Sequence, residues 1–180
     1  IRLAKAGVHG WLTAARMGQP IPLDLPFDEL QRRCKETKKL NPKLYNVIKP
    51  IVHGKNYDES AWGIYEQNPE EFDSPQQADE LVKFYLSTEP GQDLVRWHGE
   101  TRNQAHSQRF LQNAFGVKHW FWSVFAYNQW KDCYEPDSAG DGKRCLGFLP
   151  QSTAACIQRH YGRHISKDFP AIVPFLRLLT

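Results

Sequence analysis

Apolar residues recur every three or four positions in several stretches of the chain, which is the spacing of one buried helical face. In the stretch 75–88, Ser74 can cap a helix and the following proline suits the first helical turn. Asn41 and a proline open the stretch 42–54 in the same way, and the charged stretch 27–40 precedes it. The pattern predicts a helix in each of the three.

The most apolar stretch is 117–131, where aromatic and aliphatic residues fall on all sides. A segment that is apolar all round belongs at the centre of a core, so we predict a buried helix of about four turns. Two buried strands are the alternative, because aromatic and β-branched residues also favour sheet. The helix is preferred because no Asn-Gly or glycine-rich turn divides the stretch.

Two further helices are predicted nearby. Thr101 and Gln104 have the spacing of a capping box, which predicts a helix from there to Gly116. Ser152 can cap another helix that ends near residue 165. The polar segment 134–144 holds a proline and two glycines and is expected to form an exposed loop.

These elements predict a mainly α fold: a single compact multi-helix domain, 1–180, around the buried aromatic central helix 117–131. A length of 180 residues suits one domain, and no repeat or long linker demands two. The cap signals indicate about seven to nine helices. The apolar runs are too short to span a bilayer.

Charge is distributed unevenly along the chain, although its net value is only +3. The segment 56–82 holds eight acidic residues and no Lys or Arg, whereas 32–43 holds six basic residues and one acid. This separation favours a basic surface that faces a polyanion, unless the two blocks lie close together and neutralise each other.

A second basic group lies near the end of the chain. His160, Arg163, His164 and Lys167 repeat at helical spacing beside Arg159, while apolar positions 154, 157, 161 and 165 are expected to face the core. A basic stripe on an anchored helix can contact phosphates or an acidic protein. The residues expected to bind nucleic acid are Arg32, Arg33, Lys35, Arg159, His160, Arg163, His164 and Lys167.

One cluster has the residue types needed for metal-independent phosphodiester cleavage: His98, Glu100, Arg102 and His106. A histidine and a carboxylate can act as base and acid, and a guanidinium can hold the phosphate. His98 and Glu100 converge only if 97–100 is extended, because residues two apart share one side of a strand. An ordinary capped helix start is the alternative.

A zinc site can be imagined at Cys156, His160 and His164, which share a helical face, with Cys133 and Cys145 nearby. No Cys-x2–4-Cys pair supports it, so neither a metal nor another cofactor is expected. In an oxidising compartment, Cys133 and Cys145 could form a disulfide across the polar loop. The sequence leaves the compartment open.

The aromatic residues could also stack on unpaired bases, although a core role suits most such clusters. The set comprises Trp97, Trp120, Phe121, Trp122, Tyr127 and Trp130. Three function classes follow: a domain that binds RNA, DNA or an acidic protein; a nuclease-type toxin or effector enzyme; and a protein–protein interaction module without chemistry.

Overall fold

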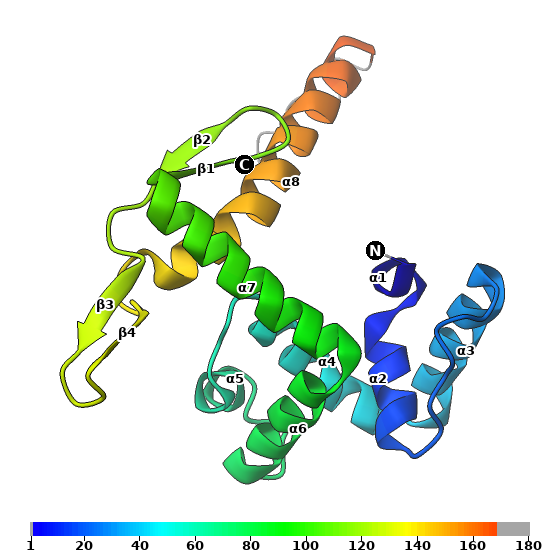
Figure 1. Ribbon diagram of the computed structural model, residues 1–180. Coiled ribbons are helices and arrows are strands. Elements are labelled where there is room, and N and C mark those ends of the chain that lie inside the picture. The colour runs from blue at the N-terminus through cyan, green and yellow to red at the C-terminus, as the bar shows by residue number, and fades with distance from the viewer. Residues whose placement is uncertain (1, 169–180) are drawn as a thin grey trace. The chain divides into compact units, whose positions relative to one another are not determined.

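The computed structural model describes residues 2–168, with side chains as far as Tyr161 (Figure 1). The described residues form eight helices and four short strands, so the mainly α fold is confirmed. The elements are α1 (Arg2–Ala6), α2 (Val8–Arg16), α3 (Phe27–Leu40), α4 (Pro42–Asn56), α5 (Ala61–Gln67), α6 (Pro75–Ser87), α7 (Glu89–Gln108), β1 (Phe110–Gln112), β2 (Lys118–Trp120), β3 (Phe125–Asn128), β4 (Cys133–Pro136) and α8 (Asp141–Asp168).

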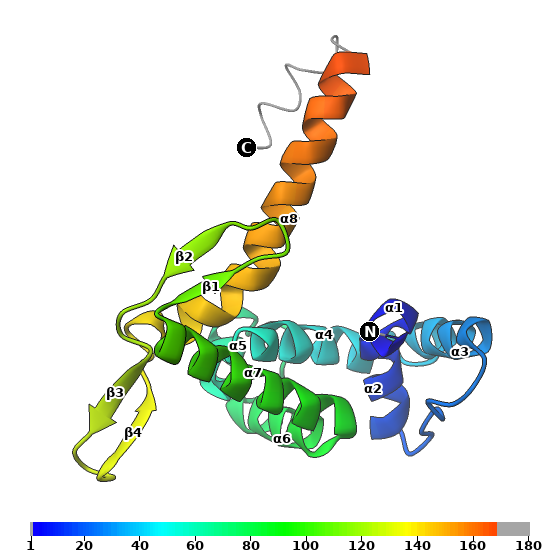
Figure 2. The ribbon, with the colours of Figure 1, turned by 45° about the horizontal axis from the view of Figure 1, so that its top comes forward.

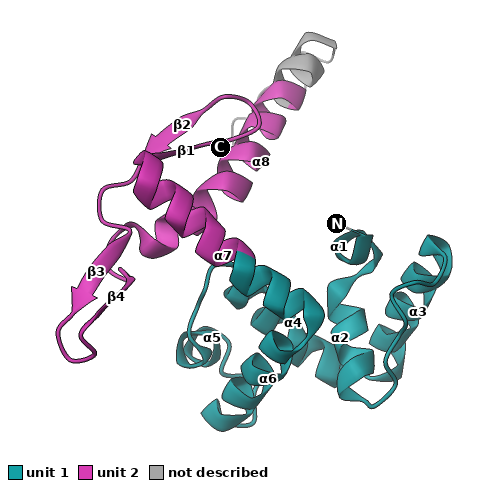
Figure 3. Ribbon diagram, viewed as in Figure 1, with its two compact units in different colours: residues 1–96 teal, residues 97–180 magenta. Residues whose placement is uncertain are grey.

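The chain divides into two compact units, shown in two colours in Figure 3. The first unit is Ile1–Arg96 and the second unit is Trp97–Thr180, so helix α7 contributes residues to both. That the whole chain forms one domain stays a prediction.

The first unit is built from helices α1 to α6 and the start of α7. Its core contains Leu12, Leu30, Ile51 and Ile64, all at most 2% exposed. Helix α2 packs on α3 and α4, and α5 packs on α6 (Figure 2). The predicted helices 27–40, 42–54 and 75–88 are confirmed as α3, α4 and α6.

Local capping explains why these helices begin where the sequence indicates. The Asn41 side chain accepts a hydrogen bond from the Leu44 backbone N at 3.0 Å. Ser74 Oγ accepts one from the Gln77 backbone N at 3.2 Å. Each cap satisfies a backbone donor that has no partner within its own helix.

An imidazole is half-buried where α2 meets α4. The His9 ring lies 5.0 Å from the His53 ring, measured between centroids, and its Nε2 atom is buried with no hydrogen-bond partner. Burial, followed by the charges of His53 and Lys49, lowers the pKa of His9 from 6.5 to about 4. The folded protein therefore holds His9 neutral over a range in which the unfolded chain protonates it.

We expect the protein to lose stability as the pH falls from 6.5 towards 4. In this window the unfolded chain binds a proton on His9 that the folded chain does not, which costs about 2 kcal/mol of unfolding free energy. Urea denaturation across this range measures the loss, and a His9→Gln variant should show a flatter profile. An equally steep loss in that variant would assign the acid sensitivity to other groups.

The second unit combines the end of α7 with two β-hairpins and helix α8. Strands β1 and β2 pair antiparallel with Phe110 opposite Trp120, and β3 pairs antiparallel with β4. The core is small, and its buried members are Ala105, Leu111, Phe121, Val124, Cys145 and Leu146.

The predicted central helix 117–131 is wrong. This stretch contains β2 and β3, and Val117, Tyr127 and Trp130 are exposed there. The turn before it was not recognised from the sequence. The buried Asn113 side chain accepts hydrogen bonds from the backbone N of Phe115 and of Val117, and this closes the chain into a hairpin.

Two helix boundaries also differ from the predicted ones. The helix predicted to reach Gly116 ends at Gln108, and Arg109 follows with a φ of 63°. Helix α8 begins at Asp141 rather than at Ser152, so the last part of the predicted loop 134–144 is its first turn.

None of the helices in the described part combines the length and apolarity needed to cross a membrane.

Candidate nucleic-acid interface

Three aromatic rings lie together on the β1–β2 hairpin and just after its end, and we call Phe110, Trp120 and Trp122 the aromatic platform. The rings of Phe110 and Trp120 lie 5.3 Å apart between centroids. Those of Trp120 and Trp122 lie 6.2 Å apart with their planes only 13° from parallel. The platform therefore offers two similarly oriented indole faces.

The two tryptophans are exposed although they adjoin the core. Trp120 is 54% exposed and Trp122 is 71% exposed, whereas Phe121 between them is fully buried. Phe121 therefore anchors this stretch to the core of the second unit, while the indole rings on either side of it reach the surface. Large apolar groups gathered on a surface mark an interaction site.

The backbone under the platform is held in place by buried polar contacts. Asp141, the first residue of α8, accepts hydrogen bonds from the backbone N of Trp122 at 2.7 Å and of Ser123 at 3.2 Å. The Phe121 backbone N donates to the Arg109 carbonyl at 2.8 Å. The rings are therefore presented from an ordered backbone, which lowers the entropy cost of binding.

Cations flank the platform. Lys118 Nζ lies 4.6 Å from the centre of the Phe110 ring, and Arg109 Nη1 donates to the Trp122 carbonyl at 3.3 Å. The second unit contains ten Lys and Arg against six Asp and Glu, whereas the first unit contains thirteen against fourteen. The positive net charge of the chain therefore belongs to the unit that carries the platform.

A second exposed aromatic group lies on the β3–β4 hairpin. Tyr127, Trp130 and Tyr134 are 54%, 89% and 73% exposed. The Tyr127 hydroxyl donates to Asp132, and this hydrogen bond raises the pKa of the tyrosine. Of the predicted stacking residues, Trp120, Trp122, Tyr127 and Trp130 are thus exposed, Trp97 is half-buried and Phe121 is core.

The candidate catalytic residues lie on one helix. The extended conformation expected for 97–100 is wrong, because α7 continues through it. His98 is buried and Glu100 is exposed, as expected for residues two apart on a helix. His106 is also exposed, with its ring 5.4 Å from that of Phe125. His98 and Glu100 therefore point to different sides of α7.

Arg102 connects two elements of the second unit. It is only 7% exposed, and its Nε atom donates to the Gly142 carbonyl in α8 at 2.8 Å. This contact gives the guanidinium a structural use and keeps it away from solvent. The phosphate-anchor role stays a prediction that this geometry does not favour.

The basic residues of α3 differ in how they are paired. Arg32 contacts both Glu29 and Glu36, and Arg33 also contacts Glu29. These hydrogen bonds lower the pKa of Glu29 to about 2. Lys35 instead donates to the Gln31 side chain at 3.0 Å. The glutamates thus partly neutralise the two arginines, which offer less positive charge to a polyanion than the sequence suggests.

The basic stripe of α8 is described only in part. Arg159 and His160 are exposed, while the side chains of Arg163, His164 and Lys167 lie outside the described residues. Of the apolar positions expected to face the core, 154, 157 and 161 are exposed, with Ile157 42% and Tyr161 62% exposed, and the side chain at 165 lies outside the described residues. This part of α8 has passed the small core of the second unit.

Among the described residues, no three His, Cys, Asp or Glu side chains lie close enough together to hold a metal ion. The His164 side chain of the imagined zinc site is outside that part of the chain. All four cysteines have free thiols, with Cys133 exposed and Cys145 buried.

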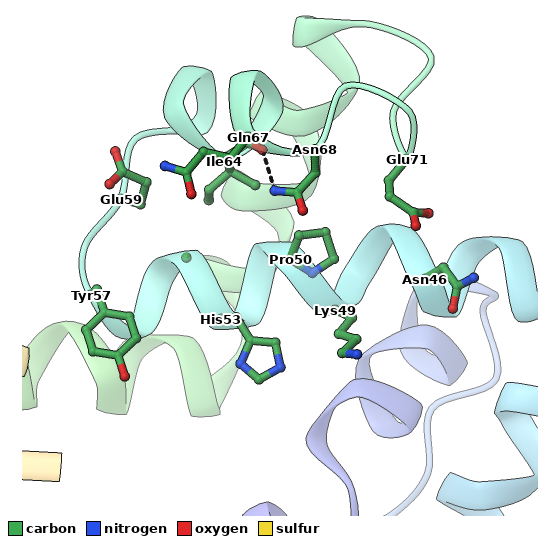
Figure 4. Close-up of a pocket in the computed structure, with 11 residues that line it drawn as sticks. Asn46, Lys49, Pro50, His53, Tyr57, Glu59, Ile64, Gln67, Asn68 and Glu71 are labelled. Atoms are coloured by element: carbon green, nitrogen blue, oxygen red, sulfur yellow. Dashed lines mark hydrogen bonds between the residues drawn. The ribbon is translucent and has the colours of Figure 1, made fainter. Parts of the chain in front are cut away.

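A polar pocket of about 470 Å³ lies beside α4 and α5 in the first unit (Figure 4). Asn68 Nδ2 donates to the Ile64 carbonyl at 2.9 Å along its wall. Figure 4 shows Lys49 and His53 pointing away from Asn68 and Glu71. The pocket therefore presents ionisable groups in divergent directions and does not form a catalytic arrangement.

No protein-family model, curated protein or solved structure matches this chain. The sequence indicated Arg109 only as a neighbour of the candidate catalytic residues, and it did not indicate Phe110 as a stacking residue. The signal that could have found Phe110 is the turn from Asn113 to Gly116, which places it across from Trp120.

Proposed function

We propose that the second unit binds single-stranded RNA or DNA on its aromatic platform. The observation that carries the proposal is the exposed, nearly parallel pair of Trp120 and Trp122. Every nucleobase has a flat face, and stacking on an aromatic side chain contributes about 1–3 kcal/mol per base. Bases in a duplex are already stacked and paired, so the platform suits unpaired strands.

The surrounding charges support a nucleic acid over a purely apolar partner. Lys118 and Arg109 lie at the platform, where they can meet the phosphates on either side of a stacked base. The exposed Arg159, together with Arg163 and Lys167, adds positive charge to the same unit. Rings that stack and cations that follow the backbone are the usual pair of features in single-strand binding.

We expect Trp120→Ala or Trp122→Ala to weaken binding of a single-stranded oligonucleotide about 5- to 150-fold, because each removes one stacking face. Fluorescence anisotropy with a labelled oligonucleotide at fixed salt measures the change. Trp130→Ala is the matched control, because Trp130 is 89% exposed but lies on the other hairpin. Equal losses in all three variants would contradict a defined platform, and stronger binding to a duplex would contradict single-strand recognition.

Lys118→Gln is expected to reduce the salt dependence of binding. Each phosphate contact contributes a slope of about −0.7 on a plot of log K against log salt for single strands, so one lost contact makes the plot shallower. Lys83→Gln serves as the control, because Lys83 is exposed on α6 and pairs with Asp79. An unchanged slope in the Lys118 variant would remove this lysine from the interface.

An acidic protein partner is the competing outcome. Such a partner would also lose affinity on Lys118→Gln, but the chain would then show little affinity for any oligonucleotide at low salt. Measuring oligonucleotide binding first, over a range of salt concentrations, therefore separates the two.

A further inference from the structure

A second pocket, of about 500 Å³, lies in the first unit where α1 and α2 meet α3. Small residues create it: Ala6, Gly7, Gly10 and Cys34 line its floor. The backbones of α2 and α3 approach closely here, and the short side chains leave space beside the crossing. The floor is therefore largely apolar.

The rim of this pocket is basic. Lys35, Lys38 and Lys39 line it together with Tyr45, and none of its lining residues is acidic. Lys38 Nζ lies 5.4 Å from the centre of the Tyr45 ring. The arginines of α3 contact glutamates, whereas no ion pair to these three lysines is seen within the described part of the chain. Lys35 donates to the Gln31 side chain, so Lys38 and Lys39 are the two lysines best placed to meet an anion.

We propose that this pocket binds the carboxylate of a medium-chain fatty acid, with the acyl chain on the apolar floor. A volume of about 500 Å³ suits a small molecule. Burial of methylene groups favours an aliphatic body, and ammonium groups form charge-assisted hydrogen bonds with a carboxylate. The lysine stems can cover the chain while their charged ends meet the head group.

Isothermal titration calorimetry of the whole chain with decanoate, kept below its micelle concentration, tests this proposal. We expect saturable binding of one decanoate per chain. Three comparison ligands separate the contributions: acetate has the head group without the chain, decanol has the chain without the charge, and decyltrimethylammonium reverses the charge. All three should bind much more weakly than decanoate.

The double variant Lys38→Gln, Lys39→Gln should weaken decanoate binding about tenfold or more, because it removes two of the three charges at the rim. Lys83→Gln on α6 is the matched control and should leave binding unchanged. Both sets of lysines are exposed, so thermal unfolding should stay nearly the same in all variants.

Two results would overturn the proposal. The first is equal binding of decanoate and decanol, which would indicate a non-specific apolar contact. The second is the absence of saturable decanoate binding. Weaker oligonucleotide binding by the double variant would then assign these lysines to a polyanion surface. Because the pocket and the aromatic platform lie in different units, failure of either proposal leaves the other in place.

Discussion

Replacing Phe121 with alanine is expected to lower the free energy of unfolding by about 3–5 kcal/mol, enough to unfold a marginally stable unit. Phe121 is fully buried, and its ring meets that of Phe148 at 6.0 Å in an edge-to-face arrangement. The core around it has few buried members, so neighbouring side chains cannot fill the cavity. Urea denaturation followed by circular dichroism measures the loss.

Trp120→Ala is the control for this prediction, because it removes an even larger side chain from the adjacent position. Trp120 is 54% exposed, so its loss should cost no more than about 1 kcal/mol of unfolding free energy. A cost similar to that of Phe121→Ala would place Trp120 in the core and would remove it from the platform. The two measurements therefore also test whether the Trp120 side chain lies at the surface, as the binding proposal requires.

Elements whose structure is determined locally were predicted correctly from the sequence. The starts of α4 and α6 were predicted from Asn41 and Ser74, and these side chains cap the helices within three residues of themselves. Capping depends on neighbours in the sequence, so it can be recognised without knowledge of the tertiary fold. The charged helix α3 was predicted for the same reason, from its own apolar spacing.

Elements whose structure depends on residues distant in the sequence were predicted wrongly. The Asn113 side chain that organises the β1–β2 turn donates to Ser152 Oγ at 3.1 Å, across 39 positions of sequence. Arg102 reaches the Gly142 carbonyl across 40 positions, and this contact buries a residue that the sequence suggested as an exposed phosphate ligand. Such pairings leave no periodic signal in either segment.

The aromatic platform was predicted only in part. The sequence identified Trp120 and Trp122 as residues that could stack on bases, but an all-round apolar pattern favoured a core helix for them. The chain instead leaves strand β2 at Trp120 and buries Phe121 in the small core, while Trp120 and Trp122 stay exposed. Composition alone could not separate the two patterns, since both require a run of large apolar residues.

Gly10→Ala is expected to destabilise the first unit by about 3 kcal/mol, because α2 packs too closely on α3 to accept a side chain. A Cβ atom at this position would lie 2.0 Å from the Cys34 carbonyl oxygen, well inside van der Waals contact. The obstacle is backbone, so no side-chain rotation can relieve it and the two helices must move apart. Urea denaturation of the variant measures the cost.

Gly99→Ala is the matched control, since Gly99 also lies inside a helix but has no atom within 4 Å of an added Cβ. Alanine restricts the unfolded chain and favours the helix, so this variant should be stabilised by about 0.5–1 kcal/mol. Opposite signs for the two substitutions would show that the close approach of α2 and α3, rather than the residue type, sets the cost at Gly10. A neutral or stabilising Gly10→Ala would contradict that approach and, with it, the apolar floor of the lysine-rimmed pocket.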